Sequence, residues 1–295
     1  MALKEIVENG QETLNLQESG CYYEITPDES QKTLRNLWKE IERFQTCDIV
    51  YCFGEERHPV TAADCASFLT AQNGLPVQDE KGNFVLDEEA VAAYAQSLAE
   101  EYDGYGRTRQ FHSTRGDVIT IEGGTYGSKM DRKKETAYLL EHLLDPGVHT
   151  GIPQTHIPIY EREAFCYGKN DIGDTYIEVD MTEQKMYYYE KGVLKLETEI
   201  VTGNMRRRMG TPEGVNFVYN KQKNRVLRGP GYASPVKFWM PVKGGIGIHD
   251  AGWRKEFGGD IYQTAGSHGC INTPKDKMEE LFDYVQIGTP VVMFY

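Results

Sequence analysis

The residues best suited to chemistry lie in one short segment near the C-terminal end of the sequence, Ser-His-Gly-Cys-Ile-Asn at residues 267–272. A second imidazole, that of His249, ends an apolar, strand-like run that begins at Ile246. A thiol is a poor nucleophile until it loses its proton, and a nearby imidazole can accept that proton. The segment therefore predicts that Cys270 is a nucleophile assisted by His249 or His268.

The residues next to Cys270 predict how its backbone is presented. Gly269 lets the chain approach other groups closely, so that the amides of Gly269 and Cys270 can point at a developing oxyanion. Thr273 and Pro274 have the residue types of a helix N-cap and of a first helical position. The positive end of such a helix would lie a few residues from the thiol and would favour its thiolate form.

Two other interpretations fit the same residue types. A lone Cys is most often a small buried hydrophobe, and a lone His is often a hydrogen-bonded residue of the core. A zinc site made of His249, Asp250, His268 and Cys270 is the third interpretation, although the sequence lacks the C-x-x-C or H-x-x-x-H spacing of common sites. Two imidazoles and a glycine-flanked thiol in one compact segment favour catalysis over both.

From about residue 174 to residue 295 the sequence resembles the L,D-transpeptidases with a YkuD-type catalytic domain. The signature of that family is a His, a spacer, and Ser/Thr-His-Gly-Cys followed by an apolar residue and usually Asn or Arg. Residues 249–272 fit this signature at every position. Three further segments carry the resemblance, at residues 201–204, 211–214 and 231–236.

The resemblance implies how the proton is handled at this site. Cys270 would be the nucleophile and His249 its base, with the backbone carbonyl of Asp250 orienting the imidazole ring. His268 lies close by as a second imidazole, and within the family either His can be argued to move the proton. The carboxylate of Asp250 receives no role, because some relatives have Ser at that position.

The resemblance also implies how substrate is held. The amides of Gly269 and Cys270, together with Tyr232, would form the oxyanion hole. Tyr232 and Trp253 fall at positions that line the donor pocket, although an aromatic residue of the core is the alternative for Trp253. Ser267 and Asn272 are expected to contribute to substrate binding, with Asn272 also bracing the loop.

The function implied by the resemblance is that of a peptidoglycan L,D-transpeptidase, a cysteine acyltransferase. Its thiol would attack the bond before the terminal D-Ala of a tetrapeptide stem, and the resulting thioester would pass to a second stem's side-chain amine in a 3-3 cross-link. Its partners would be donor and acceptor stem peptides, its inhibitors carbapenem-type β-lactams, and no metal or organic cofactor would be required. An L,D-carboxypeptidase that uses water, and a non-catalytic cell-wall-binding module, stay open as alternatives.

Charge is distributed unevenly along the 295 residues, whose formal net charge is −13. Residues 1–150 carry 27 acidic and 14 basic side chains, whereas residues 151–295 carry 18 of each. In a chain long enough for two cores, this difference predicts a domain boundary near residue 150. Because neither half is basic, nucleic acid is not expected as a partner.

After a polar lead-in at residues 1–26, an α+β domain is predicted at residues 27–150. Helical spacing or alternation predicts a helix from residue 26, a strand at 48–53, a helix at 87–102, a hairpin at 108–122 and a helix at 131–144. The apolar face of the first helix consists of Leu34, Leu37, Trp38, Ile41 and Phe44.

This N-terminal domain has a resemblance of its own. Through Phe111, Thr114, Gly116 and residues 123–127 it resembles the peptidoglycan-binding domain that often precedes these catalytic domains in Gram-positive wall enzymes. A spacer that holds the enzyme off the membrane is an equally open interpretation, because a fold implies a function only weakly.

The rest of the chain is predicted to be mostly β. Residues 151–173 contain few periodic apolar residues and are predicted to be a linker. Strands are expected at 176–180, 185–189, 193–201 and 215–220, the first three as a meander, and a helix at 274–285 precedes a last strand at 291–295. The catalytic domain at residues 174–295 is therefore expected to be a β-sandwich or open barrel with one late helix.

Residues 1–20 lack the pattern of a signal peptide, and no run approaches the ~18–20 apolar residues of a membrane span. The resemblance nevertheless implies an extracellular enzyme of the cell wall, exported or membrane-anchored through a segment outside this chain. Six cysteines occur without any C-x-x-C pair, and with Cys270 free at most two disulfides are possible. The exposed run of three arginines at residues 206–208 is expected either to be solvated or to attract an anion.

Overall fold

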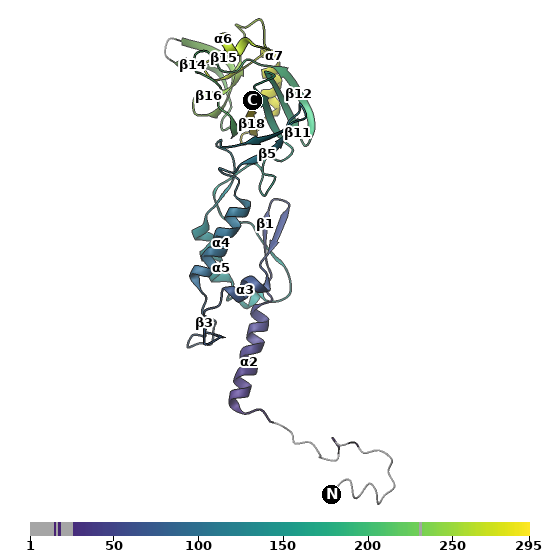
Figure 1. Cartoon of the computed structure of the whole chain (residues 1–295), viewed down its shortest axis with the longest axis vertical. Helices are drawn as coiled ribbons and strands as arrows, with labels where there is room; N and C mark the ends of the chain where they lie inside the picture. Colours follow the sequence, from purple (N-terminus) through teal and green to yellow (C-terminus); the bar gives the residue numbers. More distant parts are fainter. Residues whose placement is uncertain (1–14, 16, 19–25, 230–231) are drawn as a thin grey trace, which may run out of the picture.

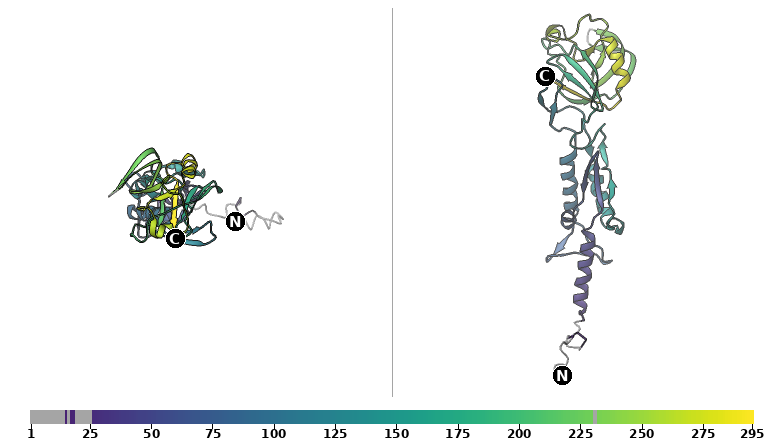
Figure 2. Two further views of the ribbon diagram at one scale, coloured as in Figure 1. Left: turned by 90° about the horizontal axis from the view of Figure 1, so that it is seen from above. Right: turned by 90° about the vertical axis from the view of Figure 1, so that its right-hand side faces the viewer.

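The computed structural model describes residues 15, 17, 18, 26–229 and 232–295, apart from the side chain of Tyr232. The chain is elongated: the C-terminal region (residues 176–294) forms one end, and the N-terminal region (residues 29–162) extends from it and finishes in a projecting helix (Figure 1). The same long axis is visible from a second side (Figure 2). The predicted lead-in lies almost entirely outside the described residues and stays a prediction.

The N-terminal region mixes helices with short strands, as predicted. Its helices are α2 (Glu29–Phe44), α3 (Ala62–Ser67), α4 (Glu88–Tyr102), α5 (Arg132–His142) and the 3-10 helix η1 (Pro146–Val148). Its strands are β1 (Ile49–Phe53), β2 (Glu56–Pro59), β3 (Ala71–Gln72), β4 (Leu75–Pro76), β5 (Arg109–His112), β6 (Val118–Ile121), β7 (Lys129–Met130), β8 (Gln154–His156) and β9 (Tyr160–Arg162). Within the described residues no helix is both long and apolar enough to cross a membrane.

Helices α4 and α5 begin where the sequence supplies an acidic cap. The carboxylate of Asp87 accepts hydrogen bonds from the amides of the first turn of α4, and Asp131 does the same for α5. Such caps satisfy amides that have no partner inside the helix. Val91 and Leu98 of α4 are buried in one core with Leu139 of α5, which explains why these helices follow their apolar spacing.

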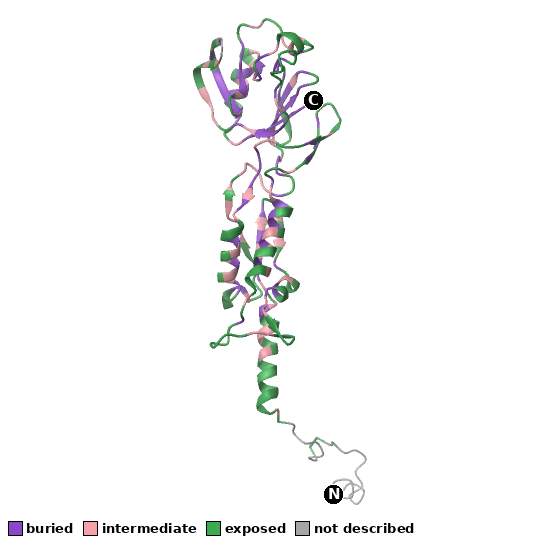
Figure 3. Ribbon diagram, turned by 60° about the vertical axis from the view of Figure 1, so that its left-hand side comes forward, coloured by how far each residue is buried: buried purple, intermediate pink, exposed green. Residues whose placement is uncertain are grey.

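Helix α2 is predicted correctly in position, but most of its apolar face is not buried. Asp28 and Gln31 form a capping box at its start. Leu34 is 54% exposed and Trp38 is 61% exposed, and the one fully buried residue of the helix is Phe44 at its end. The helix is exposed along most of its length (Figure 3). Apolar spacing therefore locates this helix without indicating a core that covers it.

The stretch predicted as a linker, residues 151–173, contains ordered strands. Strand β8 pairs in parallel with β1, and β9 pairs antiparallel with β7. Asp48, just before β1, accepts hydrogen bonds from the amides of Thr150 and Gly151. This stretch is therefore part of the N-terminal region rather than a plain linker, whereas the placing of the domain boundaries stays a prediction.

The C-terminal region consists of two open sheets and two helices. Its strands are β10 (Tyr176–Asp180), β11 (Lys185–Glu190), β12 (Val193–Glu199), β13 (Gly214–Phe217), β14 (Gln222–Gly229), β15 (Tyr232–Lys243), β16 (Ile246–Asp250), β17 (Ile271–Thr273) and β18 (Pro290–Phe294), and its helices are α6 (Ile261–Ala265) and α7 (Lys275–Tyr284). The five-stranded sheet has the order β12-β11-β10-β18-β13, and the four-stranded sheet has the order β14-β15-β16-β17. The antiparallel pairing of β10, β11 and β12 confirms the predicted meander.

The core of this region lies between the two sheets and helix α7. Ile177 and Val179 of the first sheet, Met240 and Ile248 of the second, and Leu281 of α7 belong to one buried cluster. The predicted helix at 274–285 was expected to place its apolar face here, and Met278, Leu281 and Phe282 are indeed buried. The mostly β fold with a late helix is confirmed.

The long hairpin of β14 and β15 was not predicted. β14 is mainly exposed, and β15 contains two prolines, Pro235 and Pro241. Proline cannot donate to a strand ladder, so it weakens any prediction of a strand from sequence. The register of β15 with β16 shifts between Pro241 and Lys243, an irregularity of the kind that a β-bulge produces.

Hairpin β5–β6 fastens the N-terminal region to the C-terminal sheet. The amide and the hydroxyl of Thr114 donate to the carboxylate of Glu178 at 2.8 and 2.6 Å. The ring of Phe111 packs edge-on against Tyr176, with their centroids 5.5 Å apart, and also contacts Phe294. Glu178 is fully buried by this contact.

Loop 123–127 makes the second contact between the regions. The amides of Thr125 and Tyr126 both donate to the carbonyl of Val215 in β13, at 3.0 Å. Gly124 has a φ of +99°, and a Cβ at this position would lie 2.0 Å from the oxygen of Val215. Only glycine allows this approach.

Candidate active site

His249 is positioned by the centre of the four-stranded sheet. It lies opposite Trp239 in the β15–β16 ladder and opposite Asn272 in the β16–β17 ladder. Its side chain is buried, with 4% of the residue exposed. Nδ1 lies 2.9 Å from the carbonyl oxygen of Asp250, the contact that the sequence led us to expect. Because a carbonyl can only accept, this contact places the proton on Nδ1 and leaves Nε2 as an acceptor.

The surroundings of His249 keep its imidazole neutral. Its ring lies between the indoles of Trp239 and Trp253, whose centroids are each 5.9 Å away. Burial lowers the pKa of His249 below its ordinary value, against a smaller opposing effect of the Asp250 carbonyl. A neutral imidazole with an unprotonated Nε2 is suited to accept a proton at neutral pH.

The carboxylate of Asp250 has a structural role that the sequence did not reveal. It accepts hydrogen bonds from the amides of Lys237 and Phe238, both at 2.8 Å. These bonds tie the end of β16 to β15 and so hold the carbonyl that orients His249.

Ser267 closes the turn that carries Cys270. Its hydroxyl donates to the carbonyl of Cys270 at 2.5 Å and accepts from the amide of Gly269 at 3.0 Å. Gly269 has a φ of +115°, which L side chains rarely adopt. The amide of Gly269 is therefore already engaged, which corrects the expectation that it faces an oxyanion, and the amide of Cys270 remains available for that purpose.

The segments around residues 201–204 and 211–214 hold loop 266–270 in place through hydrogen bonds to its backbone. The amide of Ser267 donates to the carbonyl of Thr202 at 2.9 Å, and the amide of Asn204 donates to the carbonyl of Ser267 at 3.0 Å. The hydroxyl of Thr211 donates to the carbonyl of Gly269 at 2.8 Å. These bonds explain why the two segments accompany the Ser-His-Gly-Cys motif.

The thiol of Cys270 is protonated at rest. Burial raises its pKa above the ordinary value, and a hydrogen bond from the Gly247 amide opposes this only in part. Helix α7 begins at Lys275 with Pro274 as its N-cap and no side-chain cap, so the expectation of Thr273 as N-cap is wrong. Thr273 is instead the last residue of β17.

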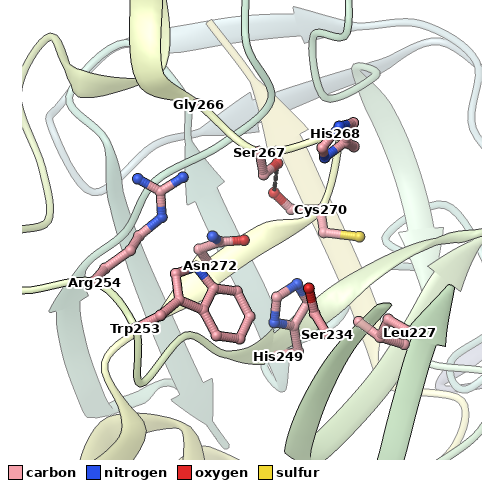
Figure 4. A pocket seen from close by; sticks show the side chains of 10 residues that line it. All are labelled: Leu227, Ser234, His249, Trp253, Arg254, Gly266, Ser267, His268, Cys270 and Asn272. Carbon is pink, nitrogen blue, oxygen red and sulfur yellow. Dashed lines mark hydrogen bonds between the residues drawn. The ribbon is translucent and has the colours of Figure 1, made fainter. Parts of the chain in front are cut away.

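The two imidazoles differ sharply in their surroundings. His268 is exposed on loop 266–270, whereas His249 is buried in the sheet. Both side chains border the same hollow as the thiol (Figure 4). Among the described residues, no hydrogen bond joins His249 to Cys270, whose sulfur lies 3.8 Å from the carbonyl of Gly245. Such contacts are often loose before substrate binds.

Cys270 lies between two cavities. The first has a volume of about 190 Å³ and is bordered by Leu227, Ser234, His249, Trp253, Arg254, Gly266, Ser267, His268, Cys270 and Asn272. The second has a volume of about 360 Å³ and is bordered by Cys270 together with residues of β14, β15 and the turn at Gly244 and Gly245. Cys270 and Leu227 of β14 therefore border both cavities.

The structure brings most predicted residues to the first cavity. Trp253 is 52% exposed there, which rules out a core role for its ring. Asn272 is buried, and its Oδ1 atom has no hydrogen-bond partner among the described residues. The side chain of Tyr232 lies outside the described residues, so its role stays a prediction. The arginines at 206–208 are exposed and lie outside both cavities.

Several residues of the site were missed by sequence reasoning, among them Trp239 and Arg254. Trp239 would have been found by pairing the run at 246–250 with the strand before it. Arg254 is a single loop arginine, and nothing in its sequence context marks it. Within the described part of the chain, no group of three His, Cys, Asp or Glu side chains is arranged to hold a metal ion.

Comparisons with known families match two parts of the chain. Residues 174–293 match the YkuD family, described as the L,D-transpeptidase catalytic domain. Residues 68–147 match a family described as "Putative peptidoglycan binding domain". A search of curated proteins found no match.

Solved structures give long matches. The crystal structure of a cysteine-to-serine variant of Enterococcus faecium L,D-transpeptidase is 35% identical, covers 88% of this chain and 100% of its own, and has a TM-score of 0.75. The Ldtfm-avibactam carbamoyl enzyme is 36% identical, covers 89% of this chain and 99% of its own, and also has a TM-score of 0.75. The NMR structure of the catalytic domain of E. faecium L,D-transpeptidase acylated by ertapenem is 51% identical over 41% of this chain and 98% of its own, with a TM-score of 0.38.

Proposed function

This chain belongs to the L,D-transpeptidase family, and from that premise we propose that it cross-links peptidoglycan stems through a thioester on Cys270. The observation that carries the proposal is the pair formed by the Cys270 thiol and the buried imidazole of His249. The Asp250 carbonyl fixes the tautomer of that imidazole, and both side chains border one cavity.

In the first half-reaction, the sulfur of Cys270 attacks the carbonyl carbon of the third stem residue. His249 takes the thiol proton through Nε2 and returns it to the leaving nitrogen, so that the C–N bond breaks and D-Ala departs as an amine. Because the resting pair is a neutral thiol and a neutral imidazole, proton transfer accompanies the attack rather than preceding it.

In the second half-reaction, the side-chain amine of an acceptor stem attacks the thioester carbon. His249 takes a proton from that amine and returns it to the sulfur as the C–S bond breaks. The amide of Cys270, together with Tyr232, would stabilise the oxyanion in both steps. We propose that the acceptor approaches through the second cavity, which also borders Cys270, while the donor occupies the first.

A relative of similar length is an avibactam carbamoyl enzyme, and we propose that β-lactam inhibitors, carbapenems included, react with the same thiol here. The strained ring of a β-lactam is opened by the same attack of the Cys270 sulfur, and His249 transfers the same proton as in the reaction with a stem peptide. We also propose that the enzyme works at the cell wall, where stem peptides occur.

The test is exchange of the terminal D-residue of a synthetic tetrapeptide by the Cys270→Ala variant. We expect exchange to vanish while the melting temperature stays within a few degrees, because the sulfur contacts only backbone groups among the described residues, the carbonyl of Gly245 at 3.8 Å and the amide of Gly247. Cys166→Ala, which alters another part-buried thiol far along the chain, should retain exchange. Persistent exchange by Cys270→Ala contradicts the mechanism, and loss of exchange together with the fold assigns Cys270 a structural role.

A further inference from the structure

Arg254 borders the first cavity without a carboxylate partner. One terminal nitrogen of its guanidinium donates to the carbonyl of Ala265 at 2.9 Å, which holds the side chain against loop 266–270. Its Nε is buried and has no hydrogen-bond partner, and no Asp or Glu of the described residues forms an ion pair with it. Figure 4 shows the guanidinium beside Trp253 and below Gly266.

An arrangement of this kind is unfavourable unless a ligand completes it. A partly buried cation without a counter-charge is destabilising, and so is a buried donor such as Nε without an acceptor. Burial lowers the pKa of Arg254, and its charge is near enough to His249 to help lower the pKa of that imidazole. The planar fork of arginine matches the geometry of a carboxylate.

A second group in the same cavity also has no partner. Oδ1 of Asn272 is buried and accepts no hydrogen bond within the described chain. The cavity wall therefore offers an acceptor at Asn272 and a cationic donor at Arg254, with the thiol at its other side. A peptide that ends in an N–H followed by a carboxylate presents the matching donor and anion.

We infer that Arg254 binds a carboxylate of the donor stem peptide and thereby selects the donor. This inference rests on the proposed function and deepens it. Two carboxylates have the required chemistry: that of the terminal D-residue, which leaves, and that of an acidic side chain on the third residue. The N–H acceptor at Asn272 favours the terminal one, whose amide nitrogen is the leaving nitrogen.

The experiment compares four synthetic tetrapeptide donors with the full chain. Each donor has meso-diaminopimelate as its third residue, and the four have both carboxylates free, only the terminal one amidated, only the side-chain one amidated, or both amidated. The quantity measured is kcat/KM for release of the terminal D-residue or its amide. The variants are Arg254→Met, Arg254→Lys and, as a matched control, Lys255→Met, which removes the same charge from an exposed neighbour outside the cavity.

We expect the wild type to prefer the free terminal carboxylate over its amide by about 10- to 100-fold, the usual range for a charge-assisted hydrogen bond. Arg254→Met should lose this preference, Arg254→Lys should keep part of it, and Lys255→Met should keep all of it. If only amidation of the side-chain carboxylate removes the advantage, Arg254 binds that carboxylate.

A wild type that treats all four donors alike overturns the inference, whatever the variants do. So does an Arg254→Met variant that slows all four donors equally. If the wild type releases the terminal residue from none of them, the proposed function itself fails, which is a different outcome.

Discussion

Loop 123–127 of the N-terminal region and loop 266–270 of the C-terminal region are both built around glycines with positive φ, yet they leave different groups available. In loop 123–127 both backbone amides and side chains are engaged in hydrogen bonds. Two amides donate to Val215, Thr125 donates to Asn216, and Tyr126 donates to the carbonyl of Asp171. In loop 266–270 the backbone is fastened by Thr202, Asn204 and Thr211, while the thiol borders two cavities.

This difference in available groups distinguishes a loop that joins the two regions from a loop that forms part of the candidate active site. Residues 111, 114, 116 and 123–127 carry the resemblance to a peptidoglycan-binding domain, yet Phe111, Thr114 and loop 123–127 pack against the C-terminal region. These residues therefore form a contact between the two regions. Function is expected where polar groups are held in place without being satisfied, as at Cys270, Asn272 and Arg254.

The largest effect expected concerns the proton carrier beside loop 266–270. His249→Ala should reduce acylation of Cys270 by about two to four decades, because loss of a general base typically costs that much. His268→Ala should weaken donor binding or deacylation more than acylation, since this side chain is exposed. Single-turnover acylation by a carbapenem, followed by intact mass, measures the rate in each variant.

The same assay has a pH dependence that follows from burial. Because burial lowers the pKa of His249 below 6.5, the base stays neutral, and acylation persists, as the pH falls below that value. Acylation is lost only as the pH falls through the lowered pKa. An acid limb at or above the ordinary histidine value would mean that His249 is not the group that titrates.

The next effect tests the contact in loop 123–127. Gly124→Ala should destabilise the chain by about 3 kcal/mol, because it adds a clash with Val215 to the strain of a positive φ. Gly123→Ala is the matched control: its φ is also positive, at +70°, but a Cβ there meets nothing within 4 Å. The control should cost only about 1 kcal/mol in urea unfolding. Equal costs for the two variants would show that the close approach to Val215 is unimportant.

The smallest effect concerns Glu178, which joins hairpin β5–β6 to the C-terminal sheet. Burial raises the pKa of Glu178 above 4.5, and the nearby charge of Asp180 also raises it. The hydrogen bonds from Thr114 and the charge of Arg115 act in the opposite direction. Glu178 therefore makes its full favourable contribution to the free energy of unfolding below pH 4.5. That contribution is lost as the pH rises through the raised pKa.

Glu178→Gln should remove this part of the pH dependence while changing stability at neutral pH by about 1 kcal/mol. Urea unfolding between pH 4 and pH 7 compares the two proteins. A variant with the same pH dependence as the wild type would show that Glu178 does not titrate in this range.

The sequence located the elements that depend on local rules. Helical spacing placed α4, α5 and α7, and alternation placed the meander of β10 to β12. The thiol and both imidazoles were found because all three belong to the signature at residues 249–272. The fold places their side chains around one cavity.

What the sequence missed depends on contacts between distant residues. Strand β8 has three residues and exists through its pairing with β1, about a hundred positions earlier in the chain. The exposed strand β14 and the proline-containing β15 have no alternation to detect. The role inferred for Arg254 depends on its position at the cavity and on the lack of a carboxylate partner there. The amide of Gly269 was expected to face an oxyanion, but it donates to the hydroxyl of Ser267.

The most direct test of the assignment of nucleophile and base is the pH dependence of Cys270 alkylation by a small reagent. In the wild type the apparent pKa should lie above the ordinary thiol value of 9.0, because burial disfavours the thiolate. Below that pKa, where the thiol is protonated and His249 is neutral, His249→Ala should slow alkylation, because no imidazole in the sheet is left to accept the thiol proton, and His268→Ala should leave the rate unchanged. Slower alkylation of His268→Ala with no change in His249→Ala would contradict the assignment and make His268 the base.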